Sequence, residues 1–441
     1  MTGFCGDTLR HIVAEQHGGH RIGIFSVCSA NRIVLEAAIL QAMADGTPVL
    51  IESTSNQVNQ FGGYTGMTPV AFARFARSVA EDMKFDAERV LLGGDHLGPN
   101  VWQNQAAATA MTQAEELVRD CVRAGYRKIH LDASMRLADD PAGPPPQELI
   151  AERTARLCLV AESAITGEAL PVYVIGTEVP TPGGSQEALE SVPATPSEEA
   201  ELTITLTREA FTARGLERAW QRVIAVVVQP GVEFGDETVV PYCREEASDL
   251  SHLIEQHESL VYEAHSTDYQ TEDCLRRMVE DHFAVLKVGP WLTFALREGI
   301  FALARMEDDL LTGAAAAHRS NIERILIETM LQDPTHWKNH YHGNDEQIRY
   351  ALKYSYSDRA RYYWPAPTVR AALDRLLVNL EQRAIPLTLM SQFMPVQYQA
   401  VRAGTLQPSP IALLRHKVME VTSLYARACG QDENNTSNEV S

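Results

Sequence analysis

The segment RVLLGGDH, residues 89–96, is an apolar run that ends in two glycines and an ionisable pair, Asp95 and His96. Short apolar runs of this kind are typical of buried strands. Longer amphipathic stretches separate the runs, and this alternation predicts repeated βα units around a parallel sheet. Seven more runs recur along the chain: RIGIFSVCS (21–29), TPVLIEST (47–54), KIHLDAS (128–134), PVYVIGTE (171–178), VIAVVVQPG (223–231), SLVYEAHS (259–266) and FAVLKVGP (283–290).

Eight βα units predict an α/β fold, and a closed (β/α)₈ TIM barrel with additional C-terminal helices is the simplest account of them. An open, doubly wound sheet is the alternative. The first run is followed by CSANRIVLE, residues 28–36, which lacks the GxGxxG fingerprint of dinucleotide-binding sheets. The sequence therefore favours the barrel.

After Pro290 the pattern changes to one helix following another. We therefore expect a TIM-barrel domain over residues 1–310 and a helical extension, packed on the barrel, over residues 311–429. The polar end of the chain, residues 430–441, has the composition of a disordered tail.

The composition excludes several classes of protein. The formal charge of −20 disfavours nucleic acid and anionic membrane surfaces, although a local basic pocket could still bind a small anion. No stretch approaches the roughly 20 apolar residues that span a bilayer, and the N-terminal residues lack the pattern of a secretory signal. Seven cysteines without a CxxC pattern read as reduced thiols. We expect a cytoplasmic protein.

Polar residues stand at or just beyond the ends of the eight apolar runs. In a parallel barrel all strands end at the same rim, so these side chains would converge although they are far apart in sequence. Buried carboxylates and imidazoles are costly unless they are paired or bind a metal, so their number indicates a functional site. The rim residues are Ser29, Asn31, Glu52, Asp95, His96, Asp132, Ser134, Glu178, Gln229, Glu263, His265 and Lys287.

This set favours metal-assisted chemistry. His96 and His265 offer nitrogen ligands, and Glu178 and Asp132 offer oxygen ligands. Two histidines and a carboxylate with one open position are how catalytic zinc or a similar divalent ion is held. Asp95, next to His96, is a candidate for proton transfer. The alternative is that the histidines are ordinary hydrogen-bonded residues.

Two further segments offer contacts to a substrate. The loop STSNQVNQFGGYTGMTP, residues 53–69, carries Asn56 and Gln57 and suits sugar hydroxyls or phosphate, or is an ordinary surface loop. The segment KYSYSDRARYYWP, residues 353–365, carries Arg359 and could grip a phosphate, or packs between domains. The predicted substrate-binding residues are Ser29, Asn31, Glu52, Asn56, Gln57, Ser134, Lys287 and Arg359.

Long motifs in the chain closely resemble those of the tagatose-1,6-bisphosphate aldolase accessory-subunit family, GatZ/KbaZ. The resemblance covers nearly the whole chain and implies a TIM barrel. It also implies a subunit that a zinc-dependent class II aldolase requires for activity or stability in galactitol or N-acetylgalactosamine catabolism. The motifs are GIFSVCSANRIVLEAAI, IESTSNQVNQFGGYTGMTP, LLGGDHLGPNVWQ, IHLDAS, VIGTEVPTPGG, VYEAHSTDYQ, LKVGPWLTFALRE and SYSDRARYYWP.

Other roles are attached to the same family. Some relatives are described as enzymes that epimerise tagatose 6-phosphate at C4, which gives fructose 6-phosphate. An older label, tagatose-6-phosphate kinase, has no support here, because the chain lacks a Walker A pattern and the kinase signatures.

A more distant likeness to the catalytic class II aldolases implies roles for individual residues. Asp95 would transfer a proton, and His96 and His265 would bind the metal. Where those enzymes supply another histidine, this chain has Gln229, whose amide is a poorer zinc ligand. This departure either weakens metal binding, so that the protein acts only as a structural partner, or it lets Glu178 complete the set of metal ligands. We therefore predict Asp95, Glu178 and Asp132 as catalytic, and His96, His265, Glu178 and Gln229 as ligands of a divalent ion, with zinc favoured.

Two hypotheses of function follow. The first is an accessory subunit of a class II aldolase, and the second is a metal-dependent epimerase or lyase acting on a ketohexose phosphate. The expected partners are that sugar phosphate and, under the first hypothesis, the catalytic aldolase subunit. A homo-oligomer is a further expectation.

Overall fold

A computed structural model describes residues 4–176 and 192–431. Eight parallel strands form a closed barrel in the order β1-β10-β9-β6-β5-β4-β3-β2, which confirms the predicted TIM barrel and excludes the open sheet. Every barrel strand falls within one of the eight apolar runs except β3, which extends one residue beyond its run to Leu97. The strands are β1 (Ile24–Val27), β2 (Val49–Thr54), β3 (Val90–Leu97), β4 (Lys128–Leu131), β5 (Val172–Gly176), β6 (Val223–Val227), β9 (Val261–Ala264) and β10 (Phe283–Val288).

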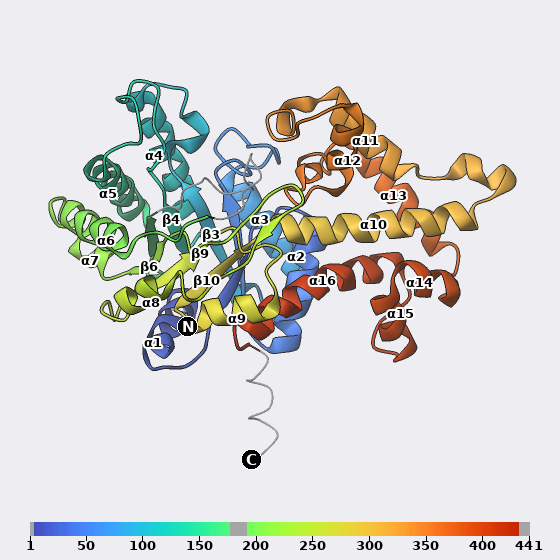
Figure 1. Ribbon diagram of the computed structural model, residues 1–441, viewed down its shortest axis with the longest axis horizontal. Helices are drawn as coiled ribbons and strands as arrows, with labels where there is room; N and C mark the ends of the chain where they lie inside the picture. Colours follow the sequence, from blue (N-terminus) through green and yellow to red (C-terminus); the bar gives the residue numbers. More distant parts are fainter. Residues whose placement is uncertain (1–3, 177–191, 432–441) are drawn as a thin grey trace, which may run out of the picture.

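Helices surround the barrel and continue beyond it (Figure 1). A small antiparallel pair, β7 (Glu233–Phe234) and β8 (Val239–Val240), follows β6. Over the barrel the helices are α1 (Phe4–His17), α2 (Arg32–Asp45), α3 (Pro69–Asp82), α4 (Ala107–Arg123), α5 (Gln147–Ala164), α6 (Ser197–Thr212), α7 (Glu217–Trp220), α8 (Ser248–Ile254) and α9 (Glu272–Glu280). After β10 come α10 (Pro290–Leu310), α11 (Ile322–Gln332), α12 (Asp345–Tyr354), α13 (Pro367–Glu381), α14 (Leu387–Phe393), α15 (Pro395–Arg402) and α16 (Pro410–Ala428).

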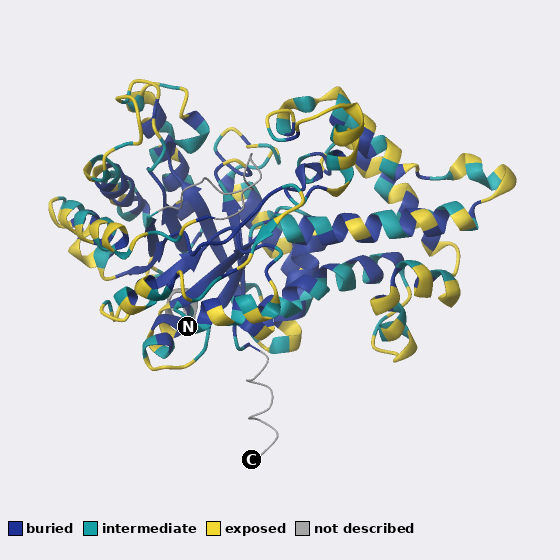
Figure 2. Ribbon diagram, in the orientation of Figure 1, coloured by how far each residue is buried: buried dark blue, intermediate teal, exposed yellow. Residues whose placement is uncertain are grey.

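Two apolar cores hold the barrel together. The larger core lies between the strands and the surrounding helices, and the smaller one fills one end of the barrel interior. Leu9, Ile12 and Val13 of α1 belong to the smaller core, so α1 closes that end. Figure 2 shows the strands buried throughout and the outer faces of the helices exposed.

The last helix, α16, returns to the barrel. In Figure 1, α10 runs away from the barrel and α16 runs back beside it, in contact with α2, α9 and α10. The Gly23 amide donates to the Cys429 carbonyl at 3.0 Å. The Tyr425 hydroxyl donates to the Thr267 carbonyl at 2.8 Å. Helix α16 thus lies between the helices that follow the seventh and first barrel strands, where an eighth helix of the ring belongs.

The predicted division of the chain at residue 310 stays a prediction. Of the expected tail, Gly430 and Gln431 are described, and Gln431 Nε2 donates to the Gly23 carbonyl. Residues 432–441 lie outside the described part of the chain. None of the described helices is long and apolar enough to cross a membrane.

Candidate metal centre

Asp95 and His96 are neighbours in strand β3, yet both side chains reach the same site. In a regular strand they would point to opposite faces of the sheet. His96 instead has a φ of +47°, and the pairing of β3 with β4 shifts register between Gly94 and Leu97. His96 Nε2 consequently lies 3.8 Å from Asp95 Oδ1. Strained backbone of this kind is common at functional sites.

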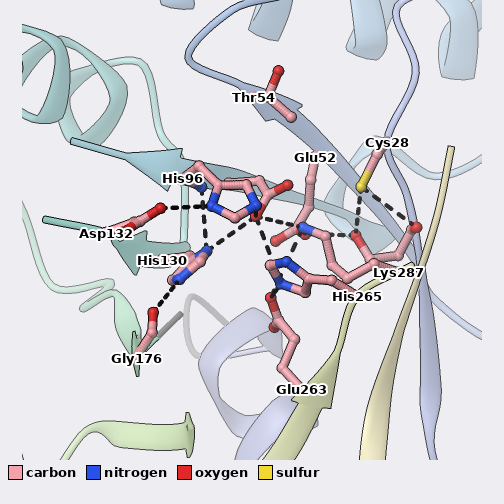
Figure 3. Close-up of polar contacts among 12 residues, drawn as sticks. Cys28, Glu52, Thr54, His96, His130, Asp132, Gly176, Glu263, His265 and Lys287 are labelled. Atoms are coloured by element: carbon pink, nitrogen blue, oxygen red, sulfur yellow. Dashed lines mark hydrogen bonds and ion pairs between the residues drawn. The ribbon is translucent and has the colours of Figure 1, made fainter. Parts of the chain in front are cut away.

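Three buried imidazoles converge at the carboxyl ends of the strands (Figure 3). His96 comes from β3, His130 from β4 and His265 from the residue after β9, and their ring centroids are 4.8–5.4 Å apart. One ligand atom from each, together with a carboxylate oxygen of Asp95, lies within 4.8 Å of all the others. The structure therefore brings the predicted pair, His96 and His265, together with Asp95.

His130 was not predicted as a ligand. It lies in KIHLDAS, where Lys128, His130 and Asp132 alternate with apolar residues. In a strand, such alternate residues share one face. This period of two, continued inward from the rim, is the signal that would have found His130.

A hydrogen-bond partner orients each imidazole (Figure 3). His96 Nδ1 lies 2.8 Å from Asp132 Oδ2, and His265 Nε2 lies 3.0 Å from Glu263 Oε1. His130 Nε2 lies 3.0 Å from the Gly176 carbonyl. Metal-binding histidines usually make such contacts through the nitrogen that does not bind the metal.

The contact with Asp132 leaves the other nitrogen of His96 facing the site. Burial by itself would raise the pKa of Asp132, but the hydrogen bond and charge of His96 outweigh burial and hold that pKa well below its usual range. The ionised carboxylate accepts the Nδ1 proton, so in the neutral imidazole, the form that binds a metal, the lone pair is on Nε2. Nε2 is buried, and no described residue bonds to it.

His130 Nδ1 lies at the same point of the site. Nε2–H donates to the Gly176 carbonyl, and Nδ1 accepts the His96 amide proton at 3.2 Å. The remaining neighbour of Nδ1 is Asp95 Oδ1, at 3.0 Å. A cation beside these two electron-rich atoms would stabilise their close approach. The buried group of three histidines and one aspartate can therefore hold a metal ion.

Buried charges lie beside this group. Lys128 Nζ lies 2.7 Å from Glu52 and 2.5 Å from Glu263. Lys287 pairs with Glu52 and lies 2.9 Å from Asp95. Burial opposes ionisation most strongly, but the charges of His96 and Lys287 outweigh it and hold the pKa of Asp95 well below its usual range. Asp95 is thus an anion at neutral pH.

A glycine makes room for this cluster. A β-carbon at residue 93 would collide with the carboxylate of Glu52. The first glycine of the GGDH motif is therefore needed for Glu52 to reach its lysine partners.

A cavity of about 160 Å³ lies against the metal-binding group. Asp95, His96, His265 and Lys287 line it together with Asn56 and Gln57. The C-terminal extension contributes Arg361 and Tyr362, and the loop after β2 contributes Tyr64. Side chains from three distant parts of the chain thus share one cavity.

Other predicted residues lie behind the cavity wall. Asp132 orients His96, and Ser134 donates to Asp132 Oδ1 at 2.6 Å. Glu52 is fully buried among the lysines. Asn31 caps α2 by accepting from the amides of Ile33 and Val34. Ser29 accepts from the Asn31 amide. Neither Ser29 nor Asn31 is among the residues that line the cavity.

The last three predicted residues have different surroundings. Gln229 Oε1 accepts from the amides of Gly231 and Val232, so its own turn engages that oxygen. Arg359 lies 2.8 Å from His340 Nδ1, and it is Arg361, two residues on, that lines the cavity. Glu178 lies outside the described residues.

The molecule is thus a TIM barrel in which a buried histidine–aspartate group that could hold a metal ion lies next to a polar cavity. The model of the D-tagatose-1,6-bisphosphate aldolase subunit GatZ/KbaZ-like family matches residues 9–430. The chain belongs to this family, as its motifs predicted.

Two solved structures are similar to the chain to very different degrees. A structure described as a probable tagatose 6 phosphate kinase from Sinorhizobium meliloti 1021 is 45% identical, with a TM-score of 0.85. The match covers 92% of this chain and 100% of that one. The YdjI aldolase from Escherichia coli K12 is 12% identical with a TM-score of 0.42, and the match covers 80% of this chain and 94% of that one. This second likeness is too distant to bear on the site.

Proposed function

We propose that this protein is a metal-dependent enzyme that interconverts tagatose 6-phosphate and fructose 6-phosphate by inverting C4. The observation that carries the proposal is the convergence of His96, His130 and His265 on Asp95 beside the cavity. An accessory subunit without chemistry of its own has no need for a buried, oriented group of this kind, which is costly to fold.

The three imidazoles would hold a divalent ion, with zinc favoured by the nitrogen donors. When bound, the ion would polarise the carbonyl group of the ketose and stabilise negative charge on the adjacent oxygen. Asp132 holds His96 in place through Nδ1, and Glu263 holds His265 in place through Nε2. Asp95 is left to move protons.

Breaking and remaking the C3–C4 bond accounts for inversion without an oxidant. Asp95 accepts the hydroxyl proton of C4 as that bond breaks, which gives glyceraldehyde 3-phosphate and the enediolate of dihydroxyacetone. The aldehyde turns to present its other face, the bond forms again, and Asp95 returns the proton to the C4 oxygen. Asp95 suits this role because Lys287 keeps it ionised in the resting site.

A second candidate function is favoured by the family match. As an aldolase subunit, the chain would support the activity or stability of a separate class II aldolase that cleaves tagatose 1,6-bisphosphate in galactitol or N-acetylgalactosamine catabolism. Both candidates place the protein in the cytoplasm, and both allow a homo-oligomer. Kinase activity, which the description of the Sinorhizobium structure suggests for that protein, is not proposed here, because this sequence has no ATP phosphate-binding motif.

The test is turnover by the purified protein alone. Protein treated with a chelator is supplied with zinc, manganese or magnesium and with tagatose 6-phosphate, and fructose 6-phosphate is measured. We expect conversion with metal and none without it. Asp95→Asn should lower the rate at least about 100-fold, whereas Asp374→Asn, the same change on the exposed side of α13, should leave it unchanged. If no metal supports conversion, the first candidate is wrong; an increase in the activity of an added class II aldolase would then support the second.

A further inference from the structure

Arg361 presents an unusual guanidinium group to the cavity. Nη1 donates to the Ser357 carbonyl and, at 3.2 Å, to the Asp358 carbonyl. Nη2 donates to the Tyr362 hydroxyl at 3.1 Å. These contacts use three of the five N–H groups. Among the described residues nothing else bonds to Arg361, so Nε–H and one Nη2–H are available to a ligand.

No described carboxylate neutralises this arginine. The adjacent Asp358 is engaged elsewhere, because its carboxylate accepts from Arg297 Nε at 2.8 Å and from the Thr293 hydroxyl at 2.6 Å. Asp268, the other acid of this part of the cavity, accepts from the amides of Gly289 and Trp291. A half-buried cation whose neighbouring acids are already satisfied favours an anion from outside the chain.

Aromatic rings hold Arg361 in this position. Its Cζ lies 4.7 Å from the ring centroid of Tyr362. Tyr362 stacks on His336 at 4.6 Å, and Tyr64, from the loop after β2, meets the same ring edge-on at 4.5 Å. The extension and the barrel loop thus fix each other beside the cavity, and both tyrosines line it.

We propose that Arg361, together with Tyr362 and Tyr64, binds the phosphate group of the sugar phosphate. This inference rests on the proposed function for the rest of the substrate. The phosphate lies at the extension side of the cavity, and the carbon chain reaches from there to His96 and His265. The helical extension after β10 is therefore part of the substrate site, since it supplies the residue that selects phosphorylated sugars.

The guanidinium of Arg361 is chemically suited to bind a phosphate ester. Two N–H groups on one edge of a guanidinium match two oxygens of a phosphate, and such charge-assisted bonds are about twice as strong as neutral ones. The hydroxyl groups of Tyr362 and Tyr64 can reach a third oxygen. Removal of the guanidinium deletes these charge-assisted bonds, so loss of Arg361 should weaken binding by about 10- to 100-fold.

The experiment measures binding to the full chain by calorimetry, with tagatose 6-phosphate, unphosphorylated tagatose and inorganic phosphate as separate ligands. Arg361→Met should weaken tagatose 6-phosphate by about 10- to 100-fold and abolish competition by inorganic phosphate, with the affinity for tagatose unchanged. Arg370→Met removes the same charge from the exposed side of α13 and should change none of these affinities. Equal affinity for tagatose 6-phosphate in Arg361→Met and the wild type would overturn the proposal.

A measurement on the wild type covers the case in which Arg361→Met does not fold. Phenylglyoxal modifies accessible arginines, and inorganic phosphate should protect Arg361 but not Arg370 when the modified peptides are quantified by mass spectrometry. Equal labelling of Arg361 with and without phosphate would contradict the site. If tagatose 6-phosphate binds through Arg361 but is never converted, the proposed function fails and the phosphate site stands. If Arg361→Met keeps both the conversion of tagatose 6-phosphate and the affinity for it, the phosphate site is wrong and the proposed function stands.

Discussion

Asp132 Oδ2 lies 2.8 Å from His96 Nδ1, so a carboxylate one strand away decides which nitrogen of His96 faces the cavity. We expect Asp132→Ala to weaken metal binding by about 10- to 100-fold, because the imidazole loses its fixed tautomer and orientation. Competition with a chelating dye measures the affinity, and circular dichroism checks the fold. Ser134→Ala, which removes only a donor to Asp132, should have a smaller effect. Equal affinities for wild type and Asp132→Ala would show that Asp132 does not act through the metal.

His130→Phe tests the ligand that was found only in the structure. Phenylalanine fills a similar volume but has no nitrogen, so we expect metal affinity to fall further than in Asp132→Ala. His257→Phe makes the same change at a histidine that pairs with Glu201 and does not line the cavity, and it should bind metal like the wild type. Full metal affinity in His130→Phe would restrict the site to His96, His265 and carboxylates.

Lys128→Met tests the buried charges next to the site. The change leaves Glu52 and Glu263 without a fully buried partner, and removal of one member of a buried ion pair costs about 3–5 kcal/mol. We expect that loss in the free energy of unfolding, measured by urea denaturation. Arg324→Met breaks an exposed pair with Glu328 and should cost about 0.5 kcal/mol or less. Similar losses in the two variants would mean that the buried cluster contributes no more than a surface pair.

The raised pKa of buried Asp268 leads us to expect that the stability of the protein depends on pH. Burial raises the pKa of Asp268 from 3.8 to about 6. Between these values the folded protein keeps a proton that the unfolded chain releases, so this residue's contribution to stability is present below pH 4 and lost as pH rises through about 6. Asp268→Asn cannot ionise, and its oxygen can still accept from the amides of Gly289 and Trp291.

The free energy of unfolding of Asp268→Asn, relative to the wild type, should therefore rise between pH 4 and pH 7. At 1.36 kcal/mol per pKa unit, the expected rise is up to about 3 kcal/mol. Denaturation curves at several pH values provide the comparison, and groups common to both proteins cancel in the difference. A constant difference across this range would mean that Asp268 titrates normally.

The eight apolar runs predicted the barrel because a parallel sheet that is covered on both faces requires nearly continuous apolar strands. The residues at the ends of the runs predicted Asp95, His96 and His265 at one site, because every strand of such a barrel ends at the same rim. Both inferences follow from topology alone. They need no knowledge of side-chain conformation.

Residues whose role depends on local backbone geometry were harder to predict. His130 lies within its strand, and only the period of two in KIHLDAS points to it. Asn31 follows the first run like a rim residue, but its side chain caps α2. In the RAR segment, Arg359 contacts His340 and Arg361 lines the cavity. The sequence of that segment cannot distinguish the two arginines, because the short helical turn Arg359–Tyr362 sets their directions.

The position of α16 orders events during synthesis. Helix α16 packs between α2 and α9 and completes the ring of helices around the barrel. It is therefore synthesised only after the rest of the helical extension. Until then, the apolar flank of α2 that α16 covers is exposed on the nascent chain. Helix α2 is therefore the place where a chaperone would bind, and a chain that stalls after α15 would be recognised there as incomplete.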